Sequence, residues 1–160
     1  MKAAPISEIK KELLNQSSSE LMDLCLSLGR FKKENKELLT YLLFESHDED
    51  AYIQSIKDQM DVQFSEINTN SFFYIRKSAR KILSLTKKFI RYSKKKETET
   101  ELLLYFCKKL RDFKPSIERS QRLQNVFDSQ VRLIKKAIEK LHEDLQYDYQ
   151  LELNDLLNNE

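Results

Sequence analysis

The chain has 160 residues, of which 40% are hydrophobic and 34% are charged, and its formal net charge is only +2. One glycine and two prolines leave little material for tight β-turns, whereas the abundant leucine, lysine and glutamate favour helix, so the composition predicts an all-α protein. The single glycine also argues against glycine-rich nucleotide-binding loops, because these loops place several glycines in one short segment.

Residues typical of helix starts predict three helices in the first part of the chain. Pro5 suits the first turn of a short helix. Ser17 and Glu20 have the spacing of a capping box, which predicts a second helix over residues 18–31. Asn35 is expected to cap a third helix, because asparagine is favoured at that position.

The capping-box spacing recurs twice further along the chain. Residues 46–49 and 98–101 both have it, and they are expected to open the fourth and the sixth helix. Between these two helices, a fifth helix is predicted from Asn70 to Ser93. Pro115 should end the sixth helix, because the residue before a proline is disfavoured in helical conformation.

A heptad-like seam predicts that the last helix is the longest. Its apolar positions step by four and three residues without a break: Phe127, Val131, Ile134, Ile138, Leu141 and Leu145. Such a helix either braces shorter helices or pairs with a second copy, and we favour bracing because the seam is too short for a coiled coil. Residues 151–160 are expected to fray, which leaves one helical domain over residues 1–150.

Two parts of the chain repeat one pattern. Apolar side chains in 21–31 and in 82–92 recur at steps of three, four and three residues, which places each set on one helical face. Each set is followed by a lysine-rich turn and a Glu-Leu-Leu-x-Tyr string. We therefore predict six or seven helices arranged as antiparallel hairpins, which stack into a short α–α superhelix or close into an irregular bundle.

Basic residues mark the corner of each predicted hairpin. If the hairpins stack in register, these corners form one rim, which comprises Arg30, Phe31, Lys32, Lys33, Lys36, Arg91, Tyr92, Lys94, Lys95 and Lys96. Cations spaced along such a rim suit a phosphate backbone and the aromatic rings suit unpaired bases, although an acidic peptide would fit equally well. Alternatively, the acidic fourth helix pairs with the basic fifth helix inside the protein.

The sequence shows no set of residues for catalysis, a cofactor or a metal. Glu139 and His142 have the helical spacing of di-iron bundles, but the second such pair is missing, and His142 is expected at the margin of the core. Cys25 and Cys107 lie among apolar residues, so both are expected to be buried, reduced thiols. We therefore expect a protein that is not an enzyme and uses no cofactor.

Three segments carry a resemblance to a known family. The strings KENKELLTYLLF (33–44), IRYS (90–93) and HEDLQYDY (142–149) resemble an uncharacterised family of small all-helical bacterial proteins with no assigned activity. The resemblance implies a bacterial cytoplasmic protein. The charged N-terminal segment agrees with a cytoplasmic location, because a signal peptide needs an apolar run.

These patterns favour one function and leave a second open. The leading hypothesis is a non-enzymatic interaction or scaffold module that binds another protein or a second copy of itself. The alternative is sequence-tolerant binding of RNA or single-stranded DNA through the basic rim. No membrane contact and no small-molecule substrate are predicted.

Overall fold

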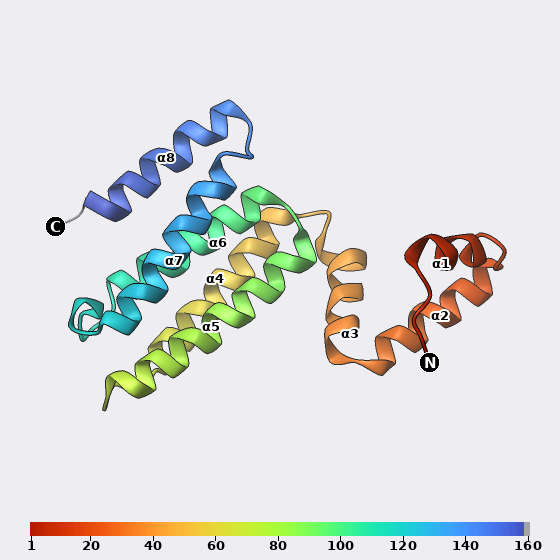
Figure 1. The fold of residues 1–160 in the computed structure, drawn as a ribbon, viewed down its shortest axis with the longest axis horizontal. Helices are drawn as coiled ribbons and strands as arrows, with labels where there is room; N and C mark the ends of the chain where they lie inside the picture. The colour runs from red at the N-terminus through yellow and green to blue at the C-terminus, as the bar shows by residue number, and fades with distance from the viewer. Residues whose placement is uncertain (159–160) are drawn as a thin grey trace. The chain divides into compact units, whose positions relative to one another are not determined.

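A computed structural model describes residues 1–158, which form eight α-helices and no strand (Figure 1). The predicted all-α class is confirmed. The chain divides into two compact units, an N-terminal unit of residues 1–44 and a C-terminal unit that begins at Glu45. None of the helices in residues 1–158 combines the length and the apolar character needed to cross a membrane.

The N-terminal unit contains three helices joined by short turns. The predicted capping box is present, because the Ser17 N–H donates to Glu20 Oε2 at 2.7 Å and the Glu20 N–H donates to Ser17 Oγ at 3.3 Å. This reciprocal pair satisfies two N–H groups that have no partner within the helix. The helices are α1 (Ile6–Leu13), α2 (Ser18–Phe31) and α3 (Lys33–Thr40), and a π-helical turn follows over Tyr41–Glu45.

Asn35 does not cap the third helix, because α3 already begins at Lys33. Its side chain instead donates from Nδ2 to the Leu28 carbonyl at 2.8 Å, so it satisfies a carbonyl at the end of α2. The side chain of Leu39 on α3 packs over Gly29 of α2, since a Cβ at this position would lie 2.9 Å from Leu39 Cδ1.

The C-terminal unit is built around α6. A run of apolar residues covers most of the circumference of this helix, and a helix of that kind has to be buried. Accordingly, α6 contacts α4, α5, α7 and α8. Its buried hydrophobic residues are Leu102, Leu103, Leu104, Phe106, Cys107 and Leu110. The helices of this unit are α4 (Glu49–Ser65), α5 (Phe72–Ser93), α6 (Lys96–Arg111), α7 (Gln121–Ile138) and α8 (Glu143–Asn158), with a 3₁₀ turn at Ile117–Arg119.

Two further predicted helix starts differ from the structure. Asp48, and not Ser46, caps α4, because its Oδ1 accepts from the Ala51 N–H at 3.0 Å. Thr98 is buried inside α6, and its hydroxyl donates to Glu49 Oε1 at 2.5 Å. Thr98 therefore connects α6 to α4 and does not start a helix.

The predicted long last helix is wrong, because it is two helices, and the structure has eight helices where six or seven were predicted. Residues 139–142 separate α7 from α8, and the chain tightens there through an N–H···O bond from Leu141 to Ile138 at 2.9 Å. Gln146 stabilises the break, because its Nε2 donates to the Leu141 carbonyl at 2.7 Å. The break allows α8 to contact α6 and α7 instead of extending into solvent.

The predicted frayed tail also differs from the structure. Residues 151–158 belong to α8, and Leu153 and Leu156 are buried. These two leucines lie one helical turn apart on the face of α8 that packs inward, so burial keeps this segment helical. Residues 159–160, the last part of the predicted tail, lie outside the described residues.

Candidate functional site

The N-terminal basic corner lies where α2 turns into α3. Two of its lysines have nearby carboxylates, since Lys32 lies 3.7 Å from Glu34 and Lys33 lies 3.7 Å from Glu37. Both lysines are exposed, although Glu37 is half-buried, and pairs at the surface contribute only ~0–1 kcal/mol. The predicted rim residues at this corner are Arg30, Phe31, Lys32, Lys33 and Lys36, all of them exposed.

The C-terminal basic corner lies between α5 and α6, and its lysines are engaged inside the unit. Lys95 Nζ lies 2.8 Å from Glu49 Oε2, and Lys96 Nζ lies 2.5 Å from Glu99 Oε2. Lys94 takes a left-handed conformation with φ at 60°, and its N–H closes the end of α5 on the Ile90 carbonyl at 2.9 Å. Lys95 therefore pairs with α4, and Lys96 pairs within α6. Neither lysine belongs to α5, so these contacts are not the pairing of the fourth helix with the fifth that the alternative interpretation expects.

The two aromatic residues of the predicted rim differ in accessibility. Phe31 is 80% exposed, whereas Tyr92 is buried at 9% exposure and packs against Phe89 with ring centroids 6.1 Å apart. A buried ring offers no face to a base, so Tyr92 does not fit the role expected from the sequence. The shared rim joins residues of both units and stays a prediction.

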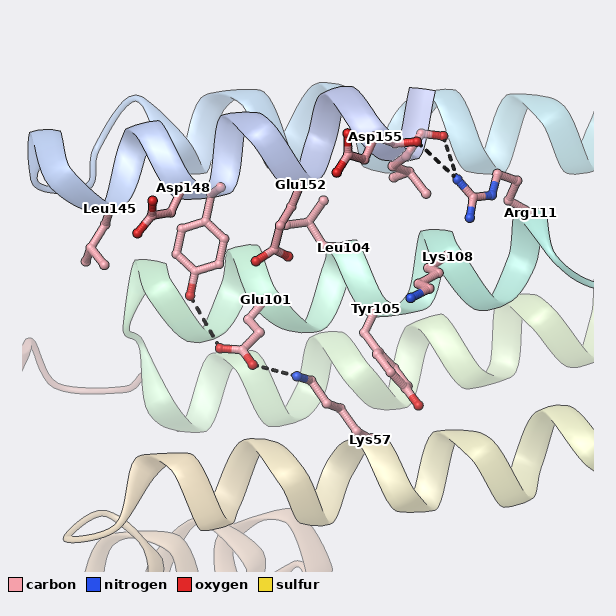
Figure 2. Close-up of a pocket in the computed structure, with 12 residues that line it drawn as sticks. Lys57, Glu101, Leu104, Tyr105, Lys108, Arg111, Leu145, Asp148, Glu152 and Asp155 are labelled. Carbon is pink, nitrogen blue, oxygen red and sulfur yellow. Dashed lines mark hydrogen bonds and ion pairs between the residues drawn. The ribbon is translucent and has the colours of Figure 1, made fainter. Parts of the chain in front are cut away.

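A groove of about 620 Å³ lies between α4, α6 and α8 (Figure 2). In its middle, Glu101 Oε1 lies 2.5 Å from Lys57 Nζ, and Glu101 Oε2 accepts from the Tyr149 hydroxyl at 3.3 Å. Figure 2 shows how this carboxylate of α6 links α8 on one side to α4 on the other. The three side chains therefore form a polar connection across three helices, which we call the Glu101 bridge.

Further contacts hold the same helices at the other end of the groove. Tyr105 donates from its hydroxyl to both oxygens of Asp61, at 2.7 and 2.8 Å, and Lys109 Nζ lies 2.9 Å from Asp61 Oδ1. Arg111 donates to the Leu156 carbonyl at 3.0 Å, where it meets the negative end of the α8 dipole (Figure 2). These contacts fasten α4 and α8 to α6.

Burial shifts the protonation equilibria of groups in this groove. It raises the pKa of Glu152, and the neighbouring carboxylates of Glu101 and Asp148 raise it further. Burial together with Glu101 also raises the pKa of Tyr149, so its hydroxyl remains a hydrogen-bond donor in the folded protein. The groove contains charges of both signs that contact one another. Such paired charges stabilise the packing of the three helices, and we call them the joint.

Tyr105 provides a pH-dependent test of this joint. Burial and the Asp61 carboxylate raise its pKa to about 12 from an ordinary value of 10.0. Because the folded protein holds this proton more tightly than the unfolded chain does, the contribution of Tyr105 to stability is full below pH 10 and is lost as the pH rises toward 12. We expect Tyr105→Phe to flatten this decline in the free energy of unfolding, measured by urea denaturation at increasing pH.

Tyr147→Phe is the matched control for this experiment, because its ring is 68% exposed. It removes one phenol from the chain but none from the groove. Equal pH slopes for the two variants would contradict the assignment of the alkaline loss to Tyr105.

The cysteines and the histidine selected from the sequence are not among the residues that line this groove. Cys107 is buried as expected, and burial raises the pKa of its thiol to about 12, so it remains protonated. Cys25 is exposed, which contradicts the expected burial. His142 lies in the turn before α8 with 76% of its side chain exposed, so it is not at the core margin.

The N-terminal unit leaves many apolar side chains exposed. No residue of α1, α2 or α3 is buried, although these helices carry many leucines. On α2, Leu24, Leu28 and Phe31 are 44%, 59% and 80% exposed, respectively. They lie at steps of four and three residues, so they share one face of the helix. Contiguous exposed apolar surface is typical of interaction sites.

Comparison of the chain with protein-family models, with curated proteins and with solved structures finds no match.

Sequence reasoning missed the Glu101 bridge, because its partners lie far apart along the chain. One signal was present: Lys57 and Asp61 are four residues apart on α4, and Glu101, Tyr105 and Lys109 follow the same step on α6. Residues at this step share a helical face, so the two series are complementary once the helices lie side by side.

Proposed function

We propose that the protein is a non-enzymatic protein–protein interaction module whose N-terminal helices form the contact surface. The observation that carries this proposal is the exposure of α2, a helix with four leucines, a methionine and a phenylalanine and with no buried residue. Covering apolar surface stabilises a complex by roughly 25 cal/mol for each Å² removed from water. A partner on this face would therefore gain free energy that the N-terminal unit alone does not provide.

The partner that best fits this surface is a second copy of the chain. Glu20 and Asp23 make the start of α2 acidic, whereas Arg30, Lys32 and Lys33 make its end basic. If two copies of α2 pair in opposite directions about a twofold axis, each acidic end meets a basic end. Residues 1–44 also have nearly balanced charge, with seven basic and six acidic side chains, so two copies do not repel each other strongly.

The oligomeric state of the purified chain tests this proposal. By size-exclusion chromatography with light scattering, we expect a mass of twice the 19.1 kDa of one chain. Leu28→Glu places a charge on the proposed contact face and should return the mass to 19.1 kDa. Circular dichroism verifies that the variant remains helical.

Leu151→Glu is the matched control, because Leu151 is also an exposed leucine, at 47%, but lies on α8. This variant should keep the doubled mass. A wild-type chain that stays at 19.1 kDa at all concentrations would overturn the self-association, and a Leu28→Glu variant that stays dimeric would overturn the choice of surface.

We also propose that the helices pack as stacked antiparallel hairpins. The support comes from a constant sequence offset, because Lys57 contacts Glu101, Asp61 contacts Tyr105 and Arg111 contacts Asp155, each pair 44 residues apart. The two pairs between α4 and α6 keep one offset, so these helices run in the same direction. Contacts of Glu101 with Tyr149 and of Arg111 with Asp155 advance together along α6 and α8, so α8 also runs in this direction, as alternate members of such hairpins do.

A further inference from the structure

A second groove, between α5 and α7 in the C-terminal unit, has a different chemistry from the Glu101 bridge. It encloses about 520 Å³, a volume suited to a small molecule or to one or two nucleotide units. The polar residues that line it are Arg76 and Arg80 from α5, and Arg122, Asn125, Ser129 and Gln130 from α7. We call it the arginine groove.

The three arginines of the groove have no carboxylate partner in residues 1–158. The only ring or charge contact of Arg76 in this part of the chain is with Phe73, whose ring centroid lies 5.8 Å from the guanidinium carbon. This differs from the α4–α6–α8 groove, where Lys57 and Lys109 are paired with carboxylates. Three unpaired guanidinium groups that line one groove favour an anion, because each presents several N–H donors to phosphate or carboxylate oxygens.

The helices that form the arginine groove are strongly basic. The α5 helix carries seven basic and no acidic side chains, and α7 carries four basic side chains and one acidic one, Asp128. The Asp128 carboxylate is already an acceptor for Gln124 Nε2 at 3.0 Å. The net charge of the whole chain is only +2, so positive charge is concentrated on these two helices. Such a concentration attracts polyanions to this face.

Gln130 adds a second, independent observation. Its side chain is 4% exposed, and Nε2 donates to the Val126 carbonyl at 3.1 Å. This bond fixes the orientation of the amide, which leaves Oε1 buried without a hydrogen-bond donor. Buried acceptors are normally satisfied, so this oxygen points to a ligand that brings an N–H or O–H group into the groove.

Two exposed aromatic rings lie at the start of α5, and one of them, Phe73, contacts Arg76. Phe73 and Tyr74 at the start of α5 are 58% and 47% exposed, with ring centroids 5.5 Å apart. An unpaired base can stack on an exposed ring, and a neighbouring arginine strengthens the contact. An acidic peptide would use the arginines but would gain less from these rings.

We propose that the arginine groove binds single-stranded nucleic acid, with its phosphates on Arg76, Arg80 and Arg122. Gln130 Oε1 accepts from a base N–H or, in RNA, from a ribose hydroxyl. Phe73 stacks on a neighbouring base. The groove recognises phosphate charge, an unpaired base and one hydrogen-bond donor, which most single strands provide. Binding therefore tolerates many nucleotide sequences. The residues of this site belong to the C-terminal unit, and its proposed binding does not require the self-association proposed above.

Fluorescence anisotropy with the full chain tests this assignment, using a labelled oligouridine of about 12 nucleotides and an oligothymidylate of the same length. We expect binding that weakens as salt rises from about 50 to about 200 mM. The variant Arg76→Gln/Arg80→Gln/Arg122→Gln should weaken binding roughly a hundredfold and reduce the slope of log affinity against log salt by about 2, because three phosphate contacts are lost. Tighter binding of oligouridine than of oligothymidylate would identify the ribose hydroxyl as the donor to Gln130, and equal binding would assign that role to a base N–H.

The matched control removes three charges elsewhere, in the variant Lys36→Gln/Arg91→Gln/Lys94→Gln. These residues belong to the rim predicted from the sequence, and the control should keep nearly all of the wild-type affinity. Equal losses of affinity in the two variants would show that binding depends on the overall positive charge. They would overturn the assignment of the binding site to the arginine groove. So would an absence of salt-sensitive binding by the wild type.

The variant Phe73→Ala tests whether the groove prefers nucleic acid to other polyanions. This variant should bind oligouridine roughly tenfold more weakly with an unchanged salt slope, because stacking is lost while the phosphate contacts remain. Polyglutamate of equal length should bind weakly to the wild type and equally to Phe73→Ala. If polyglutamate binds as tightly as oligouridine, or if Phe73→Ala has no effect, the groove is a site for acidic peptides and the nucleic-acid assignment is wrong.

Discussion

Replacing Phe106 with alanine is expected to lower the free energy of unfolding by about 3–5 kcal/mol. Phe106 is fully buried in α6, the helix that contacts α4, α5, α7 and α8, and its ring centroid lies 5.7 Å from that of Phe64. The truncation removes buried apolar surface and leaves a cavity, and both effects favour the unfolded chain. Urea denaturation followed by circular dichroism measures the change.

The position of Phe106, and not the loss of an aromatic ring as such, causes this effect. Phe73→Ala makes the same chemical change at a residue that is 58% exposed, and it should alter the free energy of unfolding by no more than about 0.5 kcal/mol. Similar losses in the two variants would contradict a core centred on α6.

The second large effect is expected at the Glu101 bridge. Glu101→Leu leaves Lys57, whose side chain is only 18% exposed, without its carboxylate, and it removes the acceptor of the Tyr149 hydroxyl. Breaking a fully buried pair costs about 3–5 kcal/mol, and since the Glu101 side chain is 29% exposed, solvent screening reduces the expected loss to about 2 kcal/mol.

A double-mutant cycle tests whether the pair itself is responsible. Adding Lys57→Met to Glu101→Leu should recover about 1 kcal/mol or more, because the partly buried charge without a partner is then removed. The same cycle on Lys96 and Glu99, a pair whose lysine is 42% exposed, should give a coupling energy of ~0–1 kcal/mol. Additive losses at Lys57 and Glu101 would show that the two charges do not act together.

Local patterns predicted much of the helical structure. The capping box of Ser17 and Glu20 and the apolar periodicity of α2 and α5 depend on residues within one or two turns, so the sequence contains the whole signal. The bounds of α2 and the end of α5 at Ser93 are confirmed for this reason.

The break between α7 and α8 was missed because the heptad-like seam continues across it. The competing signal was charge: Lys135 and Lys136 lie in the last turn of α7, whereas Glu143 and Asp144 lie in the first turn of α8. Each pair has the sign that its helix end favours. The apolar spacing predicts one helix, but packing of α8 on α6 favours two.

The two grooves could not be predicted, since each combines helices that are distant in sequence. The sequence shows the positive charge of α5. The proximity of Arg76 and Arg80 to Arg122 and Gln130 depends on the packing of α5 against α7, which the sequence does not show. The same reason explains the error at Tyr92, because the burial of a single ring is decided by tertiary contacts and not by its neighbours in the chain.

The way in which Arg111 holds α8 has a consequence for how this protein can diverge. The guanidinium bonds to the main-chain carbonyls of Asp155 and Leu156, and not to their side chains. Every amino acid supplies such a carbonyl. Random substitution near the end of α8 therefore leaves this anchor intact, whereas a change at codon 111 removes it in a single step.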